Sequence, residues 1–142
     1  MNSNMDHVAI LNNKKLLEMI LSGEKSIESR WYVHRTMPWN ILKPKDNIYF
    51  KLSGKPVMAK AVVEKVLQFE GLNEEKACRI IEEYGPKIGI TRNDSDWFKG
   101  KNYCILAFLE NPEPVKPFNI DKKGFGNSAA WLYVKDIDNV RI

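Results

Sequence analysis

A helix ends and a strand begins within the sequence Gly23-Glu24-Lys25-Ser26-Ile27-Glu28-Ser29-Arg30. Glycine commonly ends helices because it adopts the left-handed backbone conformation without strain. In an extended strand the side chains alternate between faces, so Glu28 and Arg30 point the same way and can pair, while Ile27 faces the core. Lys25 has the other parity, and it can join this pair only if the strand begins after it.

The segment before this stretch predicts a short strand followed by an amphipathic helix. Residues 7–11 are mainly apolar, as in a buried strand. The helix is expected over residues 14–22, with Asn12 or Asn13 as its N-cap. Its apolar stripe has helical spacing and consists of Leu16, Leu17, Ile20 and Leu21.

An irregular loop and a hairpin are expected after the stretch. Residues 31–45 are broken by two prolines and carry Trp31 and Trp39. Exposing a tryptophan is unfavourable, so each ring should cap the core or stack on a ligand. We expect Trp31 to cap the core and leave both possibilities open for Trp39. Strands over 47–52 and 57–68 are then expected to form a hairpin around the turn Ser53-Gly54-Lys55-Pro56.

The carboxy-terminal half predicts a second helix and two further strands. The helix should begin after Asn73, carry Glu74 and Glu75 in its first turn, and end at Gly85-Pro86. Residues 103–109 form an apolar strand, and the proline-rich run at 111–117 is compatible with an edge strand or an extended link. A glycine turn at 124–128 and a closing strand at 131–134 follow. Five to six short strands and two or three helices predict an α+β class and a small mixed barrel, since closing a sheet removes exposed edges.

Length and composition indicate one globular domain over residues 1–142. Hydrophobic residues make up 44% of the chain and charged residues 28%, which are ordinary values for a folded soluble protein and argue against disorder. No apolar run is long enough to cross a bilayer, and the amino terminus lacks a signal-peptide pattern. We therefore expect a cytoplasmic protein with no membrane partner.

The cysteines and histidines do not indicate a metal site. Cys78 and Cys104 are far apart in sequence and each lies in an apolar pattern, so a disulfide is not expected. With only His7 and His34 besides, no cluster has the spacing of metal ligands. The sequence predicts neither a metal nor another cofactor.

Positive charge is concentrated in one segment. The net charge is +4, and residues 25–65 contain nine lysines and arginines against three acids. Such a segment is typical of a phosphate-binding surface, because affinity for a polyanion comes from neutralised phosphates and released counterions. The alternative is a solvated strand face coated with lysines.

The pattern Gly23-x-Lys25-x-x-Glu28-x-Arg30, placed after a strand and a helix and before a basic hairpin, resembles the signature of the ASCH family in the PUA-like superfamily. The order of the expected elements fits the family over most of the chain. The resemblance implies a small PUA-like β-barrel of mostly antiparallel strands. It also implies a cleft between the signature strand, the adjacent loop and the barrel that holds RNA or a nucleotide-like ligand.

The resemblance gives the signature residues roles in that cleft. Lys25 and Arg30 would contact phosphate or orient a base, while Glu28 would hold Arg30 or accept from a ligand amine. A base could stack on an aromatic ring, and the glycine turn could present backbone amides. The expected ligand-binding set is Lys25, Glu28, Arg30, Trp31, Trp39 and Lys51, with Tyr32 as a further stacking residue.

Two other functions remain open. Some relatives are similar to amidohydrolases that act on acetylated cytidine through a threonine nucleophile, and nuclease activity is also associated with the family. Glu28 stands at the threonine position and cannot act as a hydroxyl nucleophile. Lys25 could instead act with Glu28, Glu74 or Glu75 as an acid–base pair in a hydrolase. The third possibility is a protein-interaction domain in which Glu28 and Arg30 form a structural ion pair.

Overall fold

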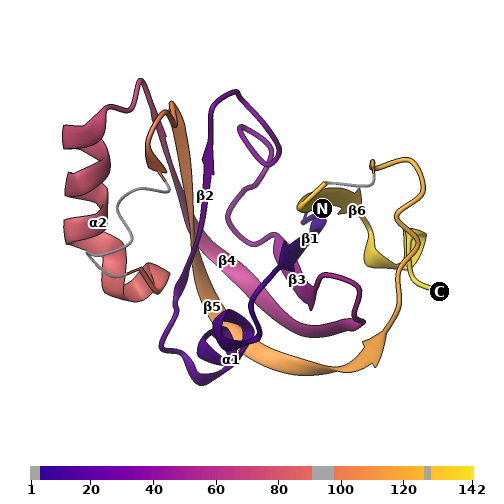
Figure 1. Cartoon of the computed structure of the whole chain (residues 1–142). Helices are drawn as coiled ribbons and strands as arrows, with labels where there is room; N and C mark the ends of the chain where they lie inside the picture. The colour runs from indigo at the N-terminus through magenta and orange to yellow at the C-terminus, as the bar shows by residue number, and fades with distance from the viewer. Residues whose placement is uncertain (1–3, 91–97, 127–128) are drawn as a thin grey trace.

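The computed structural model describes residues 4–90, 98–126 and 129–142, which form one six-stranded sheet with helices packed on it (Figure 1). The strands are β1 (Asp6–Leu11), β2 (Ile27–Tyr32), β3 (Asn47–Leu52), β4 (Val57–Glu70), β5 (Tyr103–Phe118) and β6 (Trp131–Lys135). The helices of the described part are α1 (Lys14–Ser22), α2 (Glu74–Ile88) and the short 3-10 helix η2 (Ile137–Asn139).

The sheet curls into a half-barrel with the strand order β2-β5-β4-β3-β1-β6 (Figure 1). Only the pair β1 and β3 is parallel among these neighbours, and the other four pairs are antiparallel. The predicted α+β class and the predicted barrel-like sheet of five to six mostly antiparallel strands are confirmed. The strand order nevertheless ends at β2 and β6, so the barrel stays open between these two strands.

Two apolar layers lie on opposite faces of the sheet. The predicted alternation of β4 is confirmed, because Val57, Ala59, Ala61 and Val63 are all fully buried. Most of that face forms the inside of the half-barrel with β1, β3 and the buried side of α1. Helix α2 covers the other face of β2 and β5, where its apolar side packs against Trp31. The predicted core position of Trp31 is therefore confirmed.

The predicted caps of α1 are confirmed, whereas the predicted end of α2 is wrong. Asn13 caps α1 by accepting from the Lys15 amide, and Gly23 ends it in the left-handed conformation. Helix α2 continues through Pro86 and ends at Gly89, which has a φ of 88°. Proline lacks the amide hydrogen that continues a helix ladder. Burial of Ile88 against the β2–β5 layer offsets that lost bond, and a sequence pattern does not reveal this contact.

The proline-rich run is the second half of β5. Residues 103–108 of β5 lie between β2 and β4, whereas the three prolines at 112, 114 and 117 lie where β5 has only β4 as a partner. Proline cannot donate to a ladder, so it is tolerated on such an edge. The edge-strand alternative is thus confirmed. The predicted glycine turn extends beyond the described residues at positions 127 and 128.

Helices in the described part of the chain fall short of the length and apolar character that a membrane span needs. Cys78 and Cys104 are both free. In residues 4–90, 98–126 and 129–142, no group of three His, Cys, Asp or Glu side chains is placed to hold a metal ion.

Candidate functional site

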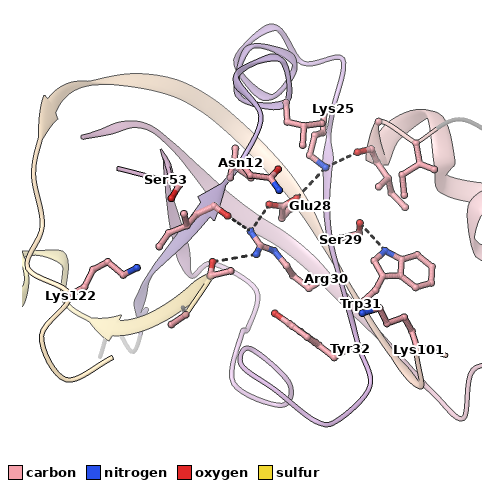
Figure 2. A pocket seen from close by; sticks show the side chains of 18 residues that line it. Asn12, Lys25, Glu28, Ser29, Arg30, Trp31, Tyr32, Ser53, Lys101 and Lys122 are labelled. Carbon is pink, nitrogen blue, oxygen red and sulfur yellow. Dashed lines mark hydrogen bonds and ion pairs between the residues drawn. The ribbon is translucent and has the colours of Figure 1, made fainter. Parts of the chain in front are cut away.

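A pocket of about 800 Å³ opens along the signature strand β2 (Figure 2). Its other walls are the end of β1, the end of α2 and the backbone at Ala129 and Ala130 just before β6. The pocket therefore lies at the open edge of the half-barrel, and its volume suits a small organic ligand. Its polar side chains are Asn12, Lys25, Glu28, Ser29, Arg30, Tyr32, Ser53, Lys101 and Lys122.

Lys25 joins Glu28 because β2 begins only at Ile27, so the alternation of faces does not yet apply at residue 25. The Lys25 Nζ lies 3.2 Å from Glu28 Oε1, and the two residues are only 3% and 4% exposed. The same Nζ donates to the carbonyl oxygens of Ile27 at 2.8 Å and Ile88 at 2.6 Å. All three N–H groups of the ammonium thus have partners, which offsets the cost of burying the charge.

Arg30 bridges the open edge of the barrel. Its Nη2 donates to Glu28 Oε2 at 3.1 Å and to the carbonyl oxygen of Ile10 in β1 at 3.4 Å. Its Nη1 donates to the carbonyl oxygen of Ala130 at 3.3 Å, and its Cζ lies 5.2 Å from the ring centre of Trp131 in β6. Figure 2 shows this guanidinium between β2 and the opposite wall. A planar group with several fixed donors can make these contacts together, whereas a lysine cannot.

The Glu28 carboxylate is held in its ionised form. Burial alone would raise the pKa of Glu28, but the charges of Lys25 and Arg30 outweigh burial and hold that pKa below its usual value. Each carboxylate oxygen faces one of these cations. The three side chains therefore form a buried group with a net charge of +1 on the wall of the pocket.

Two lysines outside the signature add positive charge at the pocket. Lys101 and Lys122 line it, and Figure 2 shows the Lys122 side chain directed toward its interior. The described residues that line the pocket include four cations but only one acid. Clefts lined by one sign of charge concentrate ligands of the opposite sign. The sequence reasoning missed both lysines, although Lys122 lies two residues before the glycine turn that was expected near a ligand.

The predicted Lys51 is not among the residues that line the pocket. It is on β3 and only 7% exposed. Burial, and then the charge of nearby Lys122, lower the pKa of Lys51. Its charge adds to the positive potential around Lys122, on the β3 side where Ser53 also lines the pocket.

The two predicted stacking tryptophans lie in different places. Trp31 lines the pocket with one edge, and its Nε1–H donates to the Ser29 hydroxyl at 3.1 Å while its ring belongs to the core under α2. Trp39 does not line the pocket. Its ring packs edge-to-face on Tyr103 with the ring centres 5.1 Å apart.

The carboxylates proposed at the start of α2 are far from Lys25. Glu74 and Glu75 occupy the first turn of the helix, whereas Lys25 binds the carbonyl of Ile88 at its other end. Fourteen residues of helix separate Glu74 from Ile88, which at ~1.5 Å per residue is about 20 Å. An acid–base pair of Lys25 with Glu74 or Glu75 is therefore excluded.

The basic segment 25–65 does not form one surface. Among its nine cations, Lys25 and Arg30 line the pocket. Lys60 lies over the ring of Tyr49 at 5.6 Å, and Lys65 lies over the ring of Phe108 at 4.3 Å. These rings pack against two different apolar clusters, so the cations of the segment, whose arrangement the sequence left open, do not share one face.

Solved structures with the same fold are found, although no protein-family model matches the sequence and no curated protein does. ASCH from Zymomonas mobilis aligns with a TM-score of 0.71 and 20% identity over 93% of this chain and 89% of that chain. A mutant of that protein gives a TM-score of 0.72 and 20% identity over 95% and 94%. The N-terminal domain of McrB from Staphylothermus marinus gives 0.55 and 14% over 97% and 94%. At these identities the likeness shows the fold.

Proposed function

We propose that this chain, which has the fold of ASCH proteins, uses its pocket to bind RNA or a modified nucleotide. The observation that carries the proposal is the pocket of about 800 Å³ at the signature strand, in which four cations face one acid among the described lining residues. A phosphate-bearing ligand matches that charge. The resemblance of the signature to the ASCH pattern supports the same class of ligand.

The lining also supports recognition of a base or sugar. Asn12, Ser53 and Tyr32 offer hydrogen-bonding groups around the pocket, and the Tyr32 ring offers an apolar face. Nucleotide sites combine such polar groups with aromatic faces, because every base has hydrogen-bonding edges and a π face.

The charged residues of the pocket divide into two buried supports and an accessible rim. Lys25 and Glu28 make their contacts inside the protein, so they position Arg30 and set the potential of the pocket. Lys101 and Lys122 are less buried and line the pocket, so they are the proposed phosphate contacts. Lys51, whose charge interacts with that of Lys122, would strengthen that potential.

A hydrolase using Lys25 and Glu28 is less well supported. An acid–base catalyst must exchange a proton with the substrate, but all three N–H groups of Lys25 are already donated to protein oxygens. The lowered pKa of Glu28 makes its carboxylate a weak base. The third possibility, a structural Glu28–Arg30 pair, is compatible with binding, because Arg30 both supports the barrel edge and lines the pocket.

The proposal is tested by salt-titrated anisotropy with a labelled single-stranded RNA. The double variant Lys101→Gln with Lys122→Gln should bind about tenfold more weakly, and its salt slope should fall by about 1.4 because two phosphate contacts are lost. Lys116→Gln, an exposed lysine near the far end of β5, is the matched control and should bind like the wild type. After the titration the RNA is recovered and run on a gel, which shows whether the protein has cleaved it.

The outcomes of this experiment distinguish RNA binding at the pocket from hydrolysis of RNA. Equal affinity in the rim variant, or no binding by the wild type at low salt, would contradict the proposal. Cleaved RNA would favour the hydrolase.

A further inference from the structure

A second cluster of one arginine and two aromatic rings lies beside the pocket, formed by Arg35 and Trp39 of the loop between β2 and β3 and by Tyr103, the first residue of β5. The Cζ of Arg35 lies 5.8 Å from the ring centre of Trp39 and 5.7 Å from that of Tyr103. The two rings pack edge-to-face. We call Arg35, Trp39 and Tyr103 the loop cluster. None of the three lines the pocket, and the proposed function does not use them.

The loop that carries Arg35 and Trp39 is fixed to the sheet. The Asn40 amide donates to the Gln68 side chain at 2.7 Å, and the Gln68 side chain donates back to Asn40 Oδ1 at 2.8 Å. Arg35 pairs with Glu70 at 3.0 Å. Gln68 and Glu70 both belong to β4, so the loop is held to the sheet at two points. The cluster is therefore formed before any ligand arrives.

The loop cluster and the pocket share one face of the sheet. Tyr32 in β2 lies directly opposite Tyr103 in β5, and Arg30 lies opposite Ile105. Directly opposed residues of antiparallel strands point to the same face, with Cα atoms about 4.5–5.5 Å apart. Tyr103 is thus the immediate neighbour of Tyr32, which lines the pocket. A chain that leaves the pocket past Tyr32 arrives at the loop cluster.

The loop cluster is better suited to stacking on a base than to binding a charged phosphate. The Arg35 side chain is 58% exposed, so its flat guanidinium is accessible although its ion pair with Glu70 balances its charge. Guanidinium planes and aromatic rings are the surfaces on which proteins stack unpaired bases. A base in a duplex is covered by its neighbours on both faces and is not available for such a contact.

We propose that the loop cluster is a second nucleotide subsite, so that the protein binds a single-stranded oligonucleotide spanning the pocket and the cluster, and not a lone nucleotide. This inference rests on the proposed function of the pocket. The pocket takes one nucleotide through charge and hydrogen bonds. The loop cluster takes a flanking base by stacking.

The experiment compares a mixed-sequence RNA hexamer, the matching DNA hexamer and the four ribonucleoside monophosphates by calorimetry. Trp39→Leu removes one ring, and Arg35→Lys keeps the charge and the ion pair with Glu70 while removing the flat surface. Either variant should lose about tenfold in affinity for the hexamer, with an unchanged salt slope and unchanged binding of monophosphates. Arg79→Lys is the control, because Arg79 also forms an exposed ion pair, with Glu75 on α2.

The outcomes separate this inference from the proposed function. Hexamer and monophosphate binding of equal strength, or variants that weaken both equally, would overturn the second subsite while leaving the pocket assignment intact. Failure of every nucleotide and hexamer to bind at low salt would overturn both. Comparison of the RNA and DNA hexamers tells which single strand the two subsites accept.

Discussion

Lys25 donates a hydrogen bond of 2.6 Å to the carbonyl oxygen of Ile88, the last residue of α2. The bond joins residues 63 positions apart and attaches the start of the signature strand to the end of the helix that covers it. The carboxyl end of a helix carries partial negative charge, so a buried cation is favoured there. A second bond from the Ser26 amide to the Lys87 carbonyl strengthens the same junction.

We predict that Lys25→Met destabilises the protein by about 3–5 kcal/mol, the usual cost of breaking a buried ion pair. The substitution leaves the carbonyl oxygens of Ile27 and Ile88 without a donor and Glu28 with one cation only. Urea unfolding followed by circular dichroism measures the loss.

Lys87→Met is the control for this variant, since Lys87 is an exposed lysine in the last turn of the same helix. It should change the free energy of unfolding by less than about 0.5 kcal/mol. Equal stability of the two variants would mean that Lys25 does not support the junction.

We predict that Arg30→Lys loosens the open edge of the barrel at unchanged charge. A lysine cannot reach Glu28 and the carbonyls of Ile10 and Ala130 together, and leaving such acceptors without a donor costs about 1–3 kcal/mol. Hydrogen exchange should speed up at the Ile10 amide, which donates to the Ala130 carbonyl next to the β1–β6 ladder, on the side of the edge that Arg30 contacts. Unchanged exchange there would show that Arg30 does not bridge the edge.

His7 is the centre of a buried hydrogen-bond chain behind the pocket. Its Nδ1 accepts from the Trp131 Nε1–H at 3.0 Å, and its Nε2 lies 2.9 Å from Asp46 Oδ2. Since tryptophan only donates, Nδ1 carries no proton and His7 is neutral with its proton on Nε2. Burial lowers the pKa of His7 below 6.5 despite the nearby Asp46. The Trp131 ring in turn contacts Arg30.

The lowered pKa of His7 predicts a loss of stability as the pH falls. Below about pH 6.5 the unfolded chain takes up a proton that the folded protein resists, so the free energy of unfolding decreases by at most about 1.4 kcal/mol per pH unit. Above that pH, His7 causes no further change in the free energy of unfolding. Urea midpoints between about pH 8 and about pH 5 measure the effect.

Two histidine variants assign the pH dependence. His7→Gln should flatten it, whereas His34→Gln, which alters an exposed loop residue, should leave it unchanged. A flat profile in the wild type would contradict the neutral, buried state of His7.

The fold could be predicted from the sequence wherever a single periodicity or a single capping residue determines the local structure. The alternation of β4, the Asn13 and Gly23 caps of α1 and the edge position of the β5 prolines all follow from local rules. The end of α2 could not, because a local rule stops a helix at Pro86 while the burial of Ile88 favours continuing it.

Of the site, only the residues of the signature could be predicted from the sequence. Strand alternation pairs Glu28 with Arg30, and Lys25 joins them because the strand begins after it, which the sequence left open. Their remaining partners, such as the carbonyls of Ile88 and Ala130, are backbone atoms far along the chain, and residue types do not reveal them. For the same reason, the count of cations in residues 25–65 overestimated how many of them lie at the pocket, and it did not include Lys101 and Lys122.

The most direct measurement is a map of amide chemical-shift changes in the labelled protein as a ribonucleoside monophosphate is added. We predict that the largest changes fall on β2 from Glu28 to Tyr32 and around Asn12, Lys122 and Ala130, the walls of the pocket. The chain offers a contrasting site, a pocket of about 520 Å³ between the end of β4 and α2 that contains Arg79 and Tyr84. Changes confined to that site, or no changes at all, would contradict the assignment of the signature pocket as the nucleotide site.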